Sequence, residues 1–204
     1  MKIQIRPAAQ GDLDKIEELY GALCDFFVGR MDSPRWSRGV YPLREHAEAE
    51  LEAKTLYVAE VGTEEKGKIR KQIAGSVSYQ RRQGEVYRKV EWQVPFDVSV
   101  FVIHILAVHP KFMRYGIGTA LLEYASELGR KQGVRAVRLD VFEENSPAIC
   151  LYERCGFVCR GVVDLGLEEI YGLKWYKVYE KLIEQDVAHT AELAISEETC
   201  CVLP

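Results

Sequence analysis

The sequence predicts an α/β fold in which a mixed β-sheet of about seven strands is flanked by about four helices. One observation is an apolar stretch at 98–108 that is followed by Gly116 and Gly118, an amphipathic segment and a second apolar stretch at 135–141. A strand, a crossover helix and a second strand form a βαβ unit with parallel strands. The other observation is size: 204 residues, 48% of them hydrophobic, are enough for a single domain, which we place at 1–183.

Periodicity and chain breakers predict the remaining elements. Apolar runs, alternating or continuous, predict strands at residues 2–6, 55–61, 69–79, 98–108, 135–141, 157–165 and 174–183, with 86–92 as a further candidate. Apolar residues at helical spacing predict helices at residues 12–28, 43–53, 117–132 and 146–155. We expect a bulge at Gly75, Ser146 as an N-cap, and a loop over 29–42, which holds two glycines and two prolines.

The strand at 98–108 has no polar face, which is typical of a strand covered on both sides in the middle of a sheet. Strict alternation assigns its side chains to two faces, with Val100, Val102, Leu106 and Val108 on one and Phe101, Ile103, Ile105 and Ala107 on the other. His104 is the only polar residue from 100 to 108.

The turn after this strand carries Gly116 and Gly118 and opens a helix. Glycine lets the backbone approach a ligand closely, and the first amides of a helix lack partners and lie at the positive end of its dipole. Such a turn favours an anion, most often a phosphate, although it is also an ordinary strand-to-helix corner. No Lys completes a P-loop here, and Leu121 stands where the dinucleotide fingerprint has its third glycine.

Charge and cysteine usage narrow the class of protein. The net charge is −4, and the residues after 183 include five acidic side chains and no Lys or Arg, so we expect an acidic tail at 184–204. The rest of the chain is close to neutral, which argues against a nucleic-acid partner. The six cysteines form no CxxC pair, which predicts reduced thiols in a cytoplasmic protein and no metal site. We expect no signal peptide and no membrane partner, because no apolar run is long enough.

The most specific stretch runs from Asn145 to Phe157 and reads Asn-Ser-Pro-Ala-Ile-Cys-Leu-Tyr-Glu-Arg-Cys-Gly-Phe. It resembles the GNAT superfamily of N-acetyltransferases, whose members carry Asn-x-x-Ala-x-x-Leu-Tyr-x-x-x-Gly-Phe at this point. The glycine turn is similar to that family's Gln/Arg-x-x-Gly-x-Gly/Ala pyrophosphate loop, and the two motifs occur in the family's order. The resemblance covers roughly residues 1–183, with one departure: Met113 stands at the Gln/Arg position.

The resemblance implies a GNAT-like sheet that is splayed between strands 98–108 and 135–141, with acetyl-CoA in the splay as the acyl donor and no metal. Main-chain groups of the first strand would pair with the pantetheine arm, and the amides of the glycine turn would hold the pyrophosphate. The implied cofactor-binding residues are Leu106, Ala107, Val108, Met113, Arg114, Tyr115, Gly116, Ile117, Gly118, Thr119, Asn145, Ala148 and Tyr152. Lys111 and Arg114 add positive charge there or are solvated surface residues.

The resemblance also implies a general base. A protonated amine with a pKa near 10 is about a thousandfold short of free base at pH 7, so a nearby base helps it to attack a thioester. The arylalkylamine acetyltransferases of this family have a similar strand, His-x-His-x-Leu-Ala-Val-His, whose second histidine falls at His104, while Val102 replaces the first. The alternative is a core histidine satisfied by a backbone carbonyl. Glu91 and Asp97 are weaker candidates for the base and are otherwise solvated loop residues.

Tyr152 matches the family tyrosine whose hydroxyl points at the sulfur and protonates the leaving thiolate; the alternative is a buried aromatic residue on an amphipathic helix. Trp36, Tyr41 and Trp92 are interpreted as walls of the acceptor pocket or, equally, as cover for a sheet edge.

We therefore expect an acetyl-CoA-dependent N-acetyltransferase that acetylates a primary amine of a small molecule by direct attack in a ternary complex, as a monomer or homodimer. One alternative is an acetyltransferase acting on protein N-termini or lysines. The other is a non-catalytic acyl-CoA-binding sensor.

Overall fold

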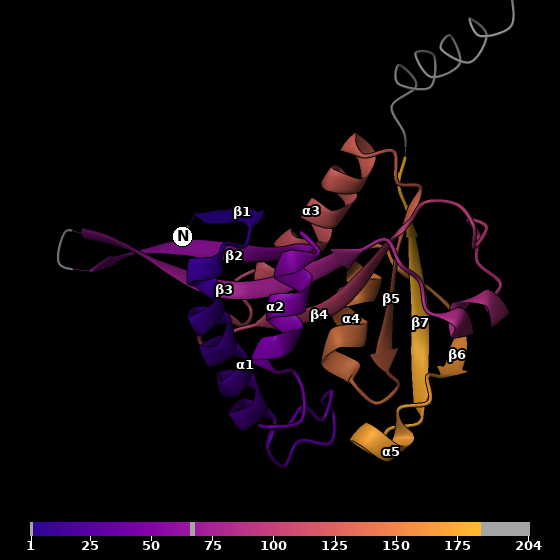
Figure 1. Ribbon diagram of the computed structural model, residues 1–204, viewed down its shortest axis with the longest axis horizontal. Helices are drawn as coiled ribbons and strands as arrows, with labels where there is room; N and C mark the ends of the chain where they lie inside the picture. Colours follow the sequence, from indigo (N-terminus) through magenta and orange to yellow (C-terminus); the bar gives the residue numbers. More distant parts are fainter. Residues whose placement is uncertain (1, 66–67, 185–204) are drawn as a thin grey trace, which may run out of the picture.

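A computed structural model describes residues 2–65 and 68–184 and contains one seven-stranded sheet in the order β1-β2-β3-β4-β5-β7-β6 (Figure 1). The strands are β1 (Ile3–Pro7), β2 (Leu56–Glu65), β3 (Lys68–Gln80), β4 (Phe101–Val108), β5 (Ala136–Phe142), β6 (Val158–Asp164) and β7 (Trp175–Leu182). The helices are α1 (Leu13–Phe27), α2 (Arg44–Glu52), α3 (Ile117–Lys131), α4 (Ser146–Arg154) and the single turn α5 (Glu168–Tyr171). The predicted mixed sheet is confirmed: β4 and β5 are parallel, and every other neighbouring pair is antiparallel.

Helices cover the sheet on both faces. Leu13, Ile16 and Leu19 of α1, together with Ala47 of α2, pack on the face that lies toward the viewer in Figure 1. The opposite face is covered by α3 and α4, whose buried residues include Ile117, Leu121, Leu122, Ala125 and Tyr152. The helix stripes read from the sequence are thus the faces that are buried.

Two details of the expected elements are wrong. Residues 86–92 do not form a strand, because a 3₁₀ helix spans Glu85–Lys89 and the chain returns to the sheet only at Phe101. The N-cap of α4 is Asn145, not Ser146, because the Asn145 side chain accepts a hydrogen bond from the amide of Ala148 at 3.4 Å. Of the acidic tail expected at 184–204, only Glu184 lies inside the described residues.

A bulge in β4 changes which side chains face which helices. Ile105 has a φ of 45°, and the β3–β4 register shifts where Ser76 pairs with Ala107 and Ser78 with His104. Leu106 therefore packs with the α3 side, as Ile103 does, while Ile105 and Ala107 pack with the α1 side. The alternation expected from the sequence holds only before the bulge. The bulge expected at Gly75 is confirmed beside it, because the β2–β3 register skips Ala74.

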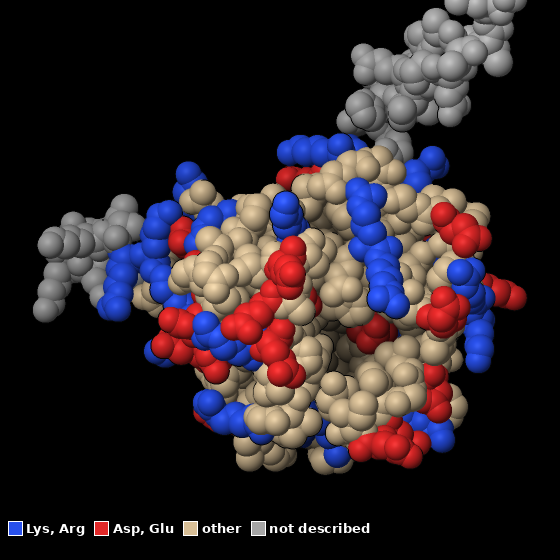
Figure 2. Space-filling model, viewed as in Figure 1, with Lys and Arg blue, Asp and Glu red and all other residues tan. Residues whose placement is uncertain are grey.

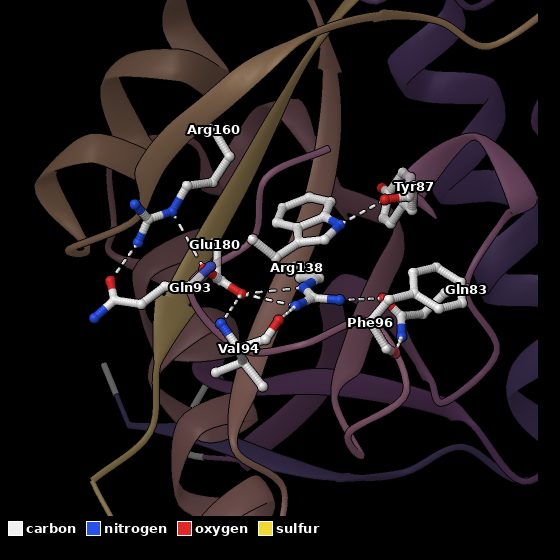
Figure 3. Close-up of polar contacts among 9 residues, drawn as sticks. Gln83, Tyr87, Gln93, Val94, Phe96, Arg138, Arg160 and Glu180 are labelled. Carbon is white, nitrogen blue, oxygen red and sulfur yellow. Dashed lines mark hydrogen bonds and ion pairs between the residues drawn. The ribbon is translucent and has the colours of Figure 1, made fainter. Parts of the chain in front are cut away.

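The segment between β3 and β4 is tied to the sheet by a buried ion pair (Figure 3). Arg138 on β5 and Glu180 on β7 have fully buried side chains joined at 2.9 Å. Arg138 also donates to the Val94 carbonyl, and Glu180 accepts from the amide of Gln93 at 2.8 Å. The indole of Trp92 lies over Arg138, at 4.2 Å from guanidinium carbon to ring centroid. These contacts hold residues 92–94 of the segment against the sheet.

Across residues 2–65 and 68–184, no helix combines the length and the apolar character needed to cross a membrane.

Candidate active site

The expected splay between β4 and β5 is confirmed. The two strands pair only from Phe101–Val137 to Ile103–Leu139. Beyond Ile103, the amide of His109 donates to the Ala74 carbonyl at 2.9 Å, so residues 107 and 109 direct their main-chain groups toward β3. Because these groups alternate along a strand, Leu106 and Val108 direct theirs toward the opening, where no strand of the described residues pairs with them.

The turn that follows β4 presents several amides at one end of α3. Arg114 and Gly116 have φ values of 66° and 80°, and α3 begins directly after Gly116. Its first intrahelical bond runs from the Ala120 amide to the Gly116 carbonyl at 2.9 Å. The amides of residues 117–119 therefore lack helical partners and lie at the positive end of the helix dipole. This is the geometry that favours a bound anion.

The other residues of this turn differ in what they contact. Met113, at the position where the family carries Gln or Arg, packs against the cluster beneath α1. Tyr115 is 62% exposed. A Cβ on Gly118 would lie 2.8 Å from a methyl carbon of Leu151, so this glycine also allows α3 and α4 to approach closely.

The α4 helix brings Tyr152 to the same region. The residue is buried, and its ring centroid lies 6.0 Å from that of Phe157 and 6.3 Å from that of Tyr179. Burial, and then the charge of Asp140, raises the pKa of Tyr152 well above its usual range. The hydroxyl therefore stays protonated near neutral pH and is chemically able to donate a proton.

His104 faces the α1 side of the sheet, beside Asp140 on β5. Burial lowers the pKa of His104, and the charge of Asp140 opposes this effect. Asp140 accepts a hydrogen bond from the Tyr87 hydroxyl at 2.8 Å, while burial raises the pKa of its carboxyl. A neutral imidazole next to a buried carboxylate is suited to accept a proton, because the carboxylate stabilises the imidazolium that forms.

The expected acceptor residues lie in two places. Tyr41 packs against Trp36 at 5.9 Å and against Tyr171 of α5 at 5.2 Å between ring centroids. Burial raises the pKa of Tyr41, and the charges of Glu50 and Asp140 raise it further. Trp92 instead lies on Arg138 in the anchored β3–β4 segment. Figure 2 shows a hollow near the middle of the same face, between α2 and β5, with acidic atoms in its wall.

Several polar residues of this face escaped the sequence analysis. Asp140 was missed although a signal existed: it alternates with apolar residues in a buried strand, as Arg138 does, so both mark a polar patch on one face. Glu50 was missed because it reads as one of several solvated glutamates on a polar helix, whereas it is only 6% exposed. The weaker candidates Glu91 and Asp97 lie in the β3–β4 segment, and Asp97 contacts Arg88 at 3.5 Å.

Comparison with known proteins gives a family match over most of the chain. A model of the acetyltransferase (GNAT) family matches residues 16–157. An uncharacterised N-acetyltransferase of Methanocaldococcus jannaschii is 48% identical over 65 residues, which is 32% of this chain and 29% of that protein. The [ribosomal protein bS18]-alanine N-acetyltransferase of Escherichia coli is 44% identical over 52 residues, 26% of this chain and 35% of that enzyme. The chain thus spans about a third of the length of these curated relatives.

The fold has counterparts among solved structures. A candidate acetyltransferase of Staphylococcus aureus is similar with a TM-score of 0.61 and 25% identity, over 89% of this chain and 99% of that one. The likeness therefore extends over 89% of this chain, well beyond the short stretches shared with the curated relatives.

Proposed function

The chain belongs to the GNAT family of acetyltransferases, and on that premise we propose that it transfers the acetyl group of acetyl-CoA to a primary amine of a small molecule. The observation that carries the proposal is the splay past Ile103, which leaves main-chain groups of Leu106 and Val108 without a strand partner beside the amides that open α3. The pantetheine arm pairs with those strand groups. The pyrophosphate binds the amides from Arg114 to Thr119. Asn145 and Ala148, at the N-terminal end of α4, also contact acetyl-CoA.

The acetyl group is transferred by direct attack in a ternary complex. His104 takes a proton from the acceptor ammonium, and its neighbour Asp140 stabilises the imidazolium. The free amine attacks the thioester carbonyl, and a β4 amide stabilises the oxyanion. The C–S bond then breaks and Tyr152 donates its proton to the departing thiolate. The nitrogen of the collapsing intermediate loses its second proton, which returns to Tyr152 through solvent, and His104 releases the first proton to solvent.

A second candidate function is acetylation of a peptide or protein amine. The local identity to the bS18-alanine N-acetyltransferase favours it. The packing of Tyr41 on Tyr171 at 5.2 Å favours a small acceptor instead, because it joins α5 to the loop before α2 on this face. A sensor that binds acyl-CoA without turnover is the third reading, and the pairing of His104 with Asp140 speaks against it.

Thiol release from acetyl-CoA, measured with a panel of small amines and a panel of short peptides, tests the proposal. We expect steady release with at least one small amine and none above background with peptides. Tight binding of acetyl-CoA with no turnover on any acceptor would establish the sensor instead.

The Tyr152→Phe variant tests the proton donor. We expect kcat to fall by roughly 10- to 1,000-fold, with little change in the affinity for acetyl-CoA. Tyr124→Phe is the matched control, because Tyr124 lies on α3 and packs against Tyr57 and Tyr79, away from the splay. An unchanged kcat in Tyr152→Phe would remove this hydroxyl from the mechanism.

A further inference from the structure

Tyr87 is a buried tyrosine whose hydroxyl contacts the carboxylate that neighbours His104. It lies in the 3₁₀ helix of the β3–β4 segment, is 3% exposed, and donates a hydrogen bond to Oδ1 of Asp140 at 2.8 Å. Its ring packs on Trp92 at 5.2 Å between centroids, and the Trp92 indole donates to its carbonyl oxygen at 2.7 Å (Figure 3). The ring and the main chain of Tyr87 are therefore held by contacts that do not involve the hydroxyl.

The register of the sheet places Asp140 and His104 side by side where the splay begins. The last paired residues of β4 and β5 are Ile103 and Leu139, and His104 and Asp140 come next in the two strands. Ile103 and Leu139 pack on the α3 side, so the side chains that follow point to the opposite face, on which Tyr87 packs. Polar groups from three separate segments thus meet at the start of the opening.

Burial disfavours charge on both members of the pair formed by His104 and Asp140. It lowers the pKa of His104 and raises the pKa of Asp140. One proton taken up by the pair can therefore rest on the imidazole, beside a carboxylate, or on the carboxyl group, beside a neutral imidazole. Attraction between the two charges favours the first arrangement, and the hydrogen bond from Tyr87 favours it as well, because it stabilises the carboxylate.

The other titratable groups around Asp140 do not compete for this role. Three tyrosines stay neutral, because burial and then nearby charges, including that of Asp140, raise their pKa: Tyr41, Tyr152 and Tyr176. Arg138 on β5 is paired with Glu180 at 2.9 Å, and burial raises the pKa of Glu50 on α2 to about 8. Among the described residues, the Tyr87 hydroxyl is the only hydrogen-bond donor to Asp140.

We propose that Tyr87 is a positioning residue of the transfer reaction, whose hydroxyl holds Asp140 as a carboxylate so that His104, and not the carboxyl group, takes the proton of the acceptor ammonium. In this step an N–H bond of the ammonium breaks, a new N–H bond forms on the imidazole, and the positive charge moves to His104. Tyr87 keeps its own proton, because burial and the charge of Asp140 raise its pKa. This inference rests on the proposed function and adds a residue that acts only through Asp140.

A pH titration followed by ¹⁵N NMR of the histidine side chains tests the proposal. The chain has four histidines, and the signal that disappears in His104→Gln identifies His104. In Tyr87→Phe we expect His104 to become charged at a pH lower by roughly 1 unit, because the first proton then rests on Asp140. Tyr179→Phe is the matched control, since it removes a tyrosine-to-carboxylate hydrogen bond, to Glu153 at 3.0 Å, on the other face of the sheet. An unchanged midpoint for His104 in Tyr87→Phe would overturn the inference.

The Asp140→Asn background shows through which group Tyr87 acts. In that background Tyr87→Phe should leave the midpoint of His104 where it is, because no carboxylate remains for the hydroxyl to stabilise. Thermal melting checks that each variant is folded. If Tyr87→Phe moves the midpoint by the same amount with and without the carboxylate, Tyr87 acts through packing alone and the inference fails.

The pH profile of kcat/KM separates this inference from the proposed function. In Tyr87→Phe the acidic limb should move to higher pH, opposite to the midpoint of His104, because a less stable carboxylate makes the pair release its shared proton later. A limb that keeps its position would mean that Tyr87 does not act on the reacting proton, and the inference would fail. If no amine is acetylated while the NMR midpoint responds to Tyr87 through Asp140, the proposed function fails and the placement of the proton by Tyr87 stands.

Discussion

Removing the carboxylate of Glu50 should change how the stability of the fold depends on pH. Glu50 is 6% exposed, and burial raises its pKa from 4.5 to about 8. One pKa unit corresponds to 1.36 kcal/mol, so ionising this group in the folded chain costs ~5 kcal/mol in total. Because the pKa is raised on folding, the free energy of unfolding is highest below pH 4.5 and falls as the pH rises toward about 8.

The size of the effect follows from the two pKa values. Between about pH 5 and about pH 9, wild type should lose ~4 kcal/mol of unfolding free energy through Glu50 alone. Glu50→Gln keeps the shape of the side chain and cannot ionise. The difference in stability between wild type and Glu50→Gln should therefore move in favour of the variant by that amount across this range. Every other titrating group is shared by the two proteins and cancels in the difference.

Urea unfolding followed by tryptophan fluorescence, repeated at several pH values, measures this difference. Glu48→Gln serves as the control for removing a carboxylate from the same helix, because the Glu48 side chain is 48% exposed. If the wild type minus Glu50→Gln difference varies by less than about 1 kcal/mol from about pH 5 to about pH 9, Glu50 is not held in an environment that opposes its charge.

Three further predictions concern other parts of the fold. His104→Gln should abolish the acidic limb of the pH profile of kcat/KM. In wild type this limb should lie below the ordinary histidine range, because burial lowers the pKa of His104. A limb that survives in the variant at the same pH would show that another group accepts the proton. Arg138→Met should lower the unfolding free energy by ~1.5–3 kcal/mol, because the fully buried Glu180 loses its 2.9 Å charged contact and keeps only Arg160, at 3.2 Å, as a cation. A loss below about 1 kcal/mol in urea unfolding would contradict this. Gly75→Ala should cost ~1–3 kcal/mol, since its Cβ would lie 2.8 Å from the Ala107 carbonyl oxygen, a main-chain atom that moves only if β3 and β4 separate; a melting temperature equal to wild type would refute it.

The sequence was informative where one physical signal dominates. Burial sets the apolar stripe of α3 and the continuous apolar run of β4, so the pattern of apolar residues predicts both elements. The order strand, helix, strand then predicts that β4 and β5 are parallel. The splay was predicted only through the resemblance to the family. It depends on where pairing stops, and no residue type marks that point.

Tertiary context decided the parts that the sequence analysis missed. The bulge at Ile105 requires a positive φ of 45°, and β-branched residues disfavour this conformation. Local sequence therefore does not predict it. Glu50 is buried only because α2 packs on the sheet through the face it shares with Ala47. The segment 81–100 avoids strand structure because Arg138 and Glu180, far along the chain, bind its main chain and side chains.

At the splay, main-chain groups form the candidate donor site and side chains form the candidate acceptor site, and this difference has an evolutionary consequence. The candidate donor site is built from amides and carbonyls of β4 and of the turn before α3, and these survive most substitutions. The candidate acceptor site is built from side chains, among them Tyr41, Tyr171, His104 and Asp140. A few point mutations can therefore change which amine the protein accepts, while its binding of the coenzyme is retained.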